Sequence, residues 1–241
     1  LLLIACGEAT KLLPLIKEDY KTYIAKLKLG VATDTLDLDG KIIEEQQAPH
    51  FSKDTIVQTL SSFLGKSKQI PPAYSAKWIN GRRAFDLVRE GIDFDLKPID
   101  IEIKEIELLE YKYPTIDFRV TISKGGYIRS LGNDIATRLN TIGHLTSLRR
   151  IKVGTYDIEQ CKSLDEVTEQ SIIPMNIFLK EYPTIELSEV QFKKAVNGAY
   201  LRLDNVTSDY CFVSFKSQII AIYFKSDDIF KCYRGLYHAS V

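Results

Sequence analysis

The segment 20–30 alternates between apolar and polar side chains, and this pattern limits the fold of the chain more than any other feature. Its lysines fall on one face, and its apolar residues fall on the other: Tyr23, Ala25, Leu27 and Leu29. Since successive side chains of a strand point to opposite sides of a sheet, the segment predicts a half-buried strand. Further strands are predicted at 100–109, 116–123 and 151–156.

Helix signals occur in the same part of the chain. Ser52 predicts the N-cap of a helix through about Leu64, because apolar residues recur four apart within it, and Gly65 predicts its end. A short helix is predicted over 84–90 and a longer one over 127–140. Strands and helices are therefore both expected here.

The chain changes in character after about residue 180. A short helix is predicted over 188–196, and four β-like runs follow it: 199–203, 210–215, 218–224 and 230–235. We therefore expect two domains, a larger one over 1–180 and a small β-rich one over 181–241.

The composition is that of a soluble globular protein. Lysine plus arginine is 32 and aspartate plus glutamate is 32, so the formal net charge is zero. This balance argues against binding of nucleic acid through total charge, although a phosphate backbone still responds to a local basic groove. No apolar run is long enough to span a membrane. The four cysteines form no CxxC pair, which suits a reducing cytoplasm.

Two short runs are similar to phosphate-binding or metal-binding motifs. The Gly65-Lys66-Ser67 run is not a P-loop, because the glycine required five positions earlier is Leu60, inside the predicted helix. The acidic loop 33–40 lacks the glutamate that closes a calcium-binding EF-hand loop. Two alternatives are open for this loop: a turn held by side-chain hydrogen bonds, or an aspartate that pairs with a functional arginine.

Three segments combine basic side chains with aromatic or glycine residues. The segment 123–129 (SKGGYIR) places two glycines, a tyrosine and an arginine where a strand meets a helix. The segments 77–89 and 144–152 add further arginines and lysines. For 123–129 the alternative is a glycine turn with an exposed arginine. A solvated charged face explains 144–152 alone, but together with 77–89 it fits a localised RNA groove in a neutral chain.

Taken in order, four blocks of residues resemble one family, the bacterial tRNA pseudouridine-55 synthases of the TruB type. The blocks are Gly7–Lys11 with Lys21-Thr22-Tyr23, Leu29-Gly30 and Thr33–Gly40; Gln69–Lys77; Ser123–Arg129; and Gly143-His144 with Leu148-Arg149-Arg150. The resemblance covers about residues 1–156. It extends only weakly to the C-terminal part, which resembles the small PUA-like RNA-binding domain of the family.

The resemblance implies an α+β fold, with a mixed, mainly antiparallel sheet flanked by helices, the pseudouridine synthase fold. It implies that one uridine in the T loop of tRNA, at position 55, is flipped out and isomerised to pseudouridine, without a cofactor or a metal. The segment 69–98 matches an insertion that clasps RNA. A cytoplasmic monomer with tRNA as its partner and no membrane association is expected.

The resemblance also implies roles for single residues. Tyr23 corresponds to the active-site tyrosine that stacks on the flipped base, and Tyr127 and Leu148 correspond to further base-contacting positions. Arg129 corresponds to the arginine that pairs with the catalytic aspartate, and Asp37 resembles a second carboxylate that contacts it. A salt bridge between Arg129 and Asp37 is therefore expected. The predicted RNA-binding residues are Lys77, Arg82, Arg83, Arg149 and Arg150.

The family's nucleophile, the aspartate of a GTLDP-like motif, is not in the chain. It is expected directly upstream of the segment that begins at Leu1. The Thr35–Asp37 run repeats part of that motif, but it lies downstream of Tyr23 and is followed by Leu38 rather than by proline. Since the only methionine is Met175, a preceding segment with the nucleophile is expected.

Two other functions fit parts of the sequence. The first is a non-catalytic RNA-binding protein or tRNA-folding chaperone, which would lack the aspartate motif altogether. The second is a lipoprotein anchored through Cys6, since Leu3–Cys6 is similar to a lipoprotein cleavage box. No basic residue precedes that box, and its apolar run is short. An enzyme that modifies tRNA is therefore the favoured hypothesis.

Overall fold

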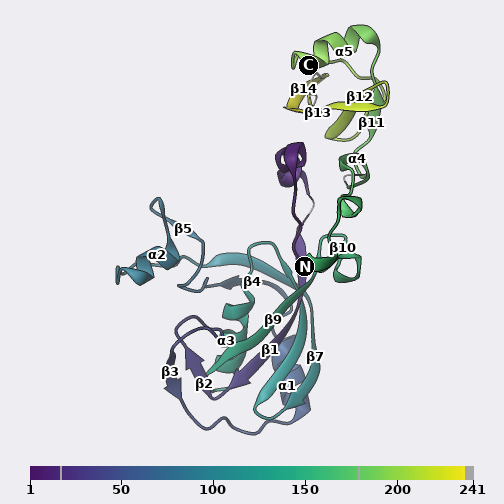
Figure 1. The fold of residues 1–241 in the computed structure, drawn as a ribbon. Helices are drawn as coiled ribbons and strands as arrows, with labels where there is room; N and C mark the ends of the chain where they lie inside the picture. The colour runs from purple at the N-terminus through teal and green to yellow at the C-terminus, as the bar shows by residue number, and fades with distance from the viewer. Residues whose placement is uncertain (17, 179, 237–241) are drawn as a thin grey trace. The chain divides into compact units, whose positions relative to one another are not determined.

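The computed structural model describes residues 1–16, 18–178 and 180–236 (Figure 1). Contacts between residues divide the chain into two compact units. One unit comprises Lys17–Cys161 together with Leu1, and the other comprises Leu2–Ile16 with Lys162–Val241. None of the helices in the described residues has the length and apolar character that crossing a bilayer requires.

A six-stranded antiparallel sheet forms the centre of the larger unit. Its strands lie in the order β10-β9-β1-β8-β7-β4, so β1 lies between β9 and β8. The strands are β1 (Tyr20–Leu29), β4 (Gly65–Gln69), β7 (Ile99–Lys112), β8 (Thr115–Ser123), β9 (Gly143–Val153) and β10 (Tyr156–Asp157). The predicted α+β class with a mainly antiparallel sheet is confirmed.

One face of this sheet is buried under helices. The helices are α1 (Lys53–Ser61) and α3 (Ile128–Arg138), and the short helix α2 (Ala84–Arg89) lies outside this core. Ile116, Phe118, Val120 and Ile122 alternate along β8 and are almost completely buried. The alternation predicted for 20–30 is confirmed, because Ala25, Leu27 and Leu29 join the same core cluster.

Two small hairpins extend the larger unit. The first pairs β2 (Val31–Thr33) with β3 (Ile42–Glu45) around the acidic loop, and the second pairs β5 (Trp78–Ile79) with β6 (Arg82–Arg83). Figure 1 shows β5 and α2 in an extension at one side of the sheet.

Three predicted boundaries in this unit were wrong. Helix α1 ends at Ser61 rather than near Leu64, and Gly65 begins strand β4 at a φ of +92° instead of only ending the helix. Strand β9 begins at Gly143 rather than at residue 151, so the basic segment 144–152 is the strand itself. Three consecutive buried residues from Gly143 hide the alternation that a half-buried strand normally shows.

The smaller unit contains a four-stranded sheet in the order β11-β12-β13-β14, in which β11 pairs with β12 in parallel. Its elements are η1 (Gly7–Leu15), α4 (Met175–Phe178), β11 (Thr184–Glu186), α5 (Glu189–Val196), β12 (Tyr210–Phe215), β13 (Gln218–Ser226) and β14 (Ile229–Gly235). Three short 3-10 turns precede α4: η2 (Ile158–Gln160), η3 (Leu164–Glu166) and η4 (Glu169–Ser171). The β-rich character predicted after residue 180 is confirmed. The run 199–203, however, contributes only an isolated bridge at Leu201.

The boundary between the units differs from the one expected at residue 180. It lies near residue 161, and residues 2–16 belong to the smaller unit. Leu12 and Leu15 of η1 are buried in a cluster with Tyr182 and Phe212, and the Tyr182 hydroxyl donates to the Leu15 carbonyl at 3.0 Å. This long-range packing leaves no signal in a local sequence pattern.

Two glycines with positive φ test how tightly the larger unit is packed. Gly30 has a φ of +87°, and a Cβ placed there would lie 2.6 Å from the Gln46 carbonyl oxygen. Gly65 has a φ of +92°, but a Cβ there would meet nothing within 4 Å. We expect Gly65→Ala to lower the free energy of unfolding by about 1–2 kcal/mol through backbone strain alone.

Gly30→Ala should lower the free energy of unfolding clearly more than Gly65→Ala does, because the backbone near Gln46 must move as well. Denaturant titration of both variants measures the difference. Equal losses would show that the close approach at Gly30 relaxes without cost.

Candidate functional site

The guanidinium of Arg129, in the first turn of α3, joins three segments of the chain. Its Nη1 donates to Asp37 Oδ2 at 3.0 Å and to the Thr35 carbonyl at 2.9 Å. Its Nη2 donates to the Tyr74 carbonyl at 2.7 Å. The predicted salt bridge between Arg129 and Asp37 is therefore confirmed. Both side chains are only partly exposed, so the pair is less screened than a surface ion pair.

The acidic loop is a turn that its own side chains hold together. Asp37 Oδ1 accepts hydrogen bonds from Thr35 Oγ1 at 2.5 Å and from the Asp39 amide at 3.2 Å, while its Oδ2 faces Arg129. Gly40 closes the turn, because a Cβ there would lie 2.3 Å from Thr35 Oγ1. Both alternatives left open by the sequence are thus present together: a hydrogen-bonded turn and an aspartate paired with an arginine.

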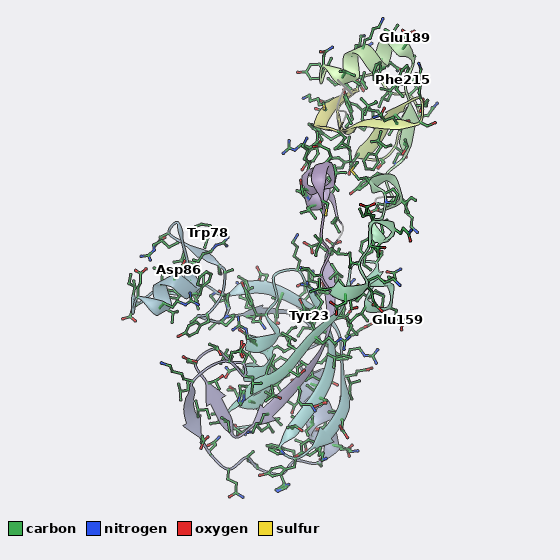
Figure 2. The ribbon with its side chains drawn as sticks, viewed as in Figure 1. Tyr23, Trp78, Asp86, Glu159, Glu189 and Phe215 are labelled. Carbon is green, nitrogen blue, oxygen red and sulfur yellow. The ribbon has the colours of Figure 1, made fainter. Side chains whose placement is uncertain are left out.

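The register of the central strands brings the base-contacting candidates to one face. Tyr23 lies opposite Arg150 of β9, and Ala25 lies opposite Leu148. Since directly opposed residues share a face, Leu148 and Tyr23 lie on the side of the sheet that α3 covers. Tyr23, labelled on β1 in Figure 2, packs partly against the core, whereas Leu148 is 45% exposed.

The acidic loop reaches the same strand. Asp37 forms a parallel bridge with Leu145 of β9, three residues before Leu148, and the Leu145 amide donates to the Leu36 carbonyl at 3.1 Å. The structure therefore brings Tyr23, Leu148 and Asp37 together around β9, with Arg129 bonded to Asp37.

Tyr127 is held by a residue that the sequence did not single out. The buried side chain of Gln69 accepts from the Tyr127 amide at 2.8 Å and donates to the Tyr127 carbonyl at 3.0 Å. One residue further on, the Ile70 carbonyl accepts from Ser130 Oγ at 2.7 Å. The start of the insertion 69–98 is thus bonded to the start of α3.

The comparisons with known proteins agree with this arrangement. The family model described as TruB family pseudouridylate synthase (N terminal domain) matches residues 1–128. A protein of Mycoplasma mobile named tRNA pseudouridine synthase B is 38% identical over 87% of this chain and 71% of its own length. A protein of the same name from Sulfurovum sp. is 41% identical over 83% of this chain and 73% of its own length.

The chain belongs to the TruB family of pseudouridylate synthases. The predicted family, and with it the enzyme class, are therefore confirmed.

Solved structures show the same fold at lower identity. A crystal structure of a Cbf5-Nop10-Gar1 complex matches with a TM-score of 0.60 and 20% identity. The match covers 91% of this chain and 64% of that chain. A structure of an H/ACA RNP bound to a substrate RNA containing 2′-deoxyuridine matches with the same TM-score and 19% identity. Since it covers 91% of this chain, the match to the Cbf5-Nop10-Gar1 structure includes residues of both units.

The strand pleat separates the two arginines predicted to bind RNA in β9. Arg149 lies opposite Ile24 and is exposed on the face without helices, whereas Arg150 lies opposite Tyr23. Arg150 Nε also donates to the Leu1 carbonyl at 2.9 Å. The two arginines therefore point to opposite faces of the sheet, and their role in RNA binding stays a prediction.

The basic residues of the TruB-type insertion already have partners within it. Arg82 forms an ion pair with Glu90, and Arg83 donates to the Ala76 carbonyl. Lys77 Nζ donates to the Lys97 carbonyl at 3.2 Å. Part of their hydrogen-bonding capacity is thus used inside the protein, which reduces what each can offer to RNA.

Gln69 gives a direct test of how this site is held. Gln69→Leu would leave the Tyr127 amide without its partner in a partly buried place, while the Tyr127 carbonyl would keep its bond from the Leu131 amide. We expect the substitution to lower the free energy of unfolding by about 1–3 kcal/mol. Denaturant titration measures the loss.

Gln69→Glu adds a pH test of the same contact. A protonated glutamic acid can still donate to the Tyr127 carbonyl, but a carboxylate cannot, so folding should raise the pKa of the new carboxyl above its usual value of about 4.3. The folded state then binds more protons, and the stability of Gln69→Glu relative to the unchanged protein should fall as the pH rises through that raised pKa. A constant difference across pH would contradict the hydrogen bond.

Proposed function

We propose that the protein, in a form with the expected aspartate motif upstream of Leu1, converts the uridine at position 55 in the T loop of tRNA to pseudouridine. The junction at Arg129 supports this most directly. A partly buried guanidinium paired with the Asp37 carboxylate is suited to an active site that must keep a carboxylate ionised next to a flipped base.

The reaction needs a base pocket and a charged group rather than a metal. The glycosidic C–N bond breaks, the uracil turns, and a C–C bond forms at C5, from which a proton leaves. Removing the base from its stack costs a few kcal/mol, and stacking on an aromatic ring returns about 1–3 kcal/mol. Tyr23 supplies that ring, and Tyr127 and Leu148 contact the base.

The position of Leu1 supports the place expected for the nucleophile. The Leu1 amine donates to the Arg150 carbonyl at 2.9 Å, and Arg150 lies opposite Tyr23 in the sheet. The last residue of an aspartate motif joined directly before Leu1 would therefore lie near the pair of strands that carries Tyr23. In that form Arg129 pairs with the nucleophile, and Asp37 holds the arginine from its other side.

The binding partner in this proposal is the T stem-loop of tRNA, bound by a monomer in the cytoplasm. Phosphate contacts from basic residues would position the RNA, since such contacts carry most of the affinity and little of the sequence information. The proposed set is Lys77, Arg82, Arg83, Arg149 and Arg150. Because Arg149 and Arg150 lie on opposite faces, they reach different parts of the RNA.

The proposal is tested by the release of tritium from tRNA labelled at C5 of uridine, with the protein in the form that has the aspartate. The unchanged protein should release tritium from position 55. Tyr23→Ala should abolish release while tRNA affinity changes little, because the phosphate contacts remain. Tyr20→Ala, at the outer face of the same strand, is the matched control. Tight tRNA binding without release by the unchanged protein would instead favour a chaperone.

Arg129→Lys separates charge from geometry. A lysine keeps the positive charge, but one ammonium cannot reach Asp37, Thr35 and Tyr74 in the planar arrangement of a guanidinium. Since a hydrogen bond to a charged group contributes about 1.5–3 kcal/mol, kcat should fall by about tenfold or more, with little change in tRNA affinity.

Arg138→Lys, in the last turn of the same helix, is the control, since Arg138 donates to Ser62 Oγ and lies over the Phe63 ring, away from the acidic loop and the insertion. If Arg129→Lys kept full activity, Arg129 would be an anchor for the helix and nothing more.

A further inference from the structure

Trp78 is the only tryptophan of the chain, and its side chain is 60% exposed. It lies in the hairpin of β5 and β6, directly opposite Arg83. The connecting residues Asn80 and Gly81 both have positive φ, at 48° and 84°, as the favoured two-residue hairpin turns require. The turn therefore holds Trp78 at an ordered tip, where Figure 2 labels it.

An arginine supports the ring from one side. The Arg83 Cζ lies 4.1 Å from the centre of the Trp78 ring, and the Arg83 side chain is itself held by the Ala76 carbonyl. This cation–π contact fixes the orientation of the indole. An exposed aromatic ring that is held in this way can stack with little further loss of side-chain freedom.

The arginines of the tip already have partners within the protein, so stacking can add to what their charge offers to RNA. Arg82 is neutralised by Glu90, and Arg83 is engaged with Ala76 and Trp78. The insertion also contains acidic residues close by, such as Asp86 in α2. An apolar, planar side chain surrounded by cations that already have partners is better suited to a base than to a phosphate.

We propose that Trp78 is a stacking platform for an unpaired nucleobase of the RNA substrate. This inference rests on the proposed function, because it takes tRNA as the ligand. Bases inside a helix have both faces covered by their neighbours, so only a base in a loop can stack on a side chain. Trp78 thus contacts loop nucleotides of the T arm rather than its paired stem.

The single tryptophan makes the contact directly observable in this chain, without any catalytic step. A T stem-loop RNA is titrated into the protein, and the fluorescence of Trp78 is followed. Binding is measured in parallel by anisotropy of a label on the RNA. We expect saturable quenching of the tryptophan with the same Kd as the anisotropy, and much weaker quenching by a fully paired RNA of equal length.

Substitution separates stacking from charge. Trp78→Ala should weaken binding of the T stem-loop by about 5- to 150-fold, the effect of losing one stacked base. The slope of log K against log salt should stay unchanged, because no phosphate contact is lost. The affinity of Trp78→Phe for the T stem-loop should lie between that of Trp78→Ala and that of the unchanged protein. Val57→Ala, an exposed apolar residue on α1, is the control and should bind like the unchanged protein.

Three results would overturn the inference while leaving the proposed function intact: unchanged fluorescence at saturating RNA, unchanged affinity of Trp78→Ala, or equal quenching by the paired RNA. A reduced salt slope in Trp78→Ala would also overturn it, by showing that Trp78 only positions Arg83 on a phosphate. If the unchanged protein bound no tRNA by anisotropy, the proposed function would fail, and this inference with it.

Discussion

The guanidinium of Arg129 is the contact on which the arrangement of the site depends. It spans the start of α3, the acidic loop and the first residues of the insertion, with hydrogen bonds of 2.7–3.0 Å to Tyr74, Thr35 and Asp37. Three segments far apart in the sequence thus share one cation. Because a guanidinium donates in a fixed plane, its position determines where the carboxylate and the insertion can lie.

The strand register of the central sheet determines which side chains lie on the same face as this contact. Tyr23 and Leu148 lie on one face only because β1 and β9 pair in a register that places Ala25 opposite Leu148. A shift of one residue in either strand would turn the side chain of that strand to the outer face, away from its neighbour. The buried residues of β8 prevent such a shift, since it would also expose the core. The same register of the central strands is therefore required both for core packing and for the geometry of the site.

Much of the fold could be predicted from the sequence, because alternation in 20–30 and the cap at Ser52 are local signals. The salt bridge between Arg129 and Asp37 was predicted through resemblance to a family and not from spacing, since the two residues are 92 positions apart. Gln69 begins one of the family-like blocks, but no role was predicted for it, because that role is a pair of hydrogen bonds to a backbone 58 residues away. The packing of residues 2–16 on the smaller unit was missed for the same reason. Local periodicity in a sequence does not reveal tertiary contacts of this kind.

The hydrogen bonds of the insertion separate its root from its tip. At the root, Gln69, Ile70 and Tyr74 bond to the first turn of α3. At the tip, the side-chain hydrogen bonds and ion pairs of Lys77, Arg82 and Arg83 all end within the insertion, in the part of the chain that the structure describes. At the root, the Tyr74 carbonyl bonds to Arg129 itself, while Gln69 and Ile70 bond to its neighbours at the start of α3. The position of the root and the position of the guanidinium therefore depend on each other, whereas the hydrogen bonds of these tip residues do not involve α3.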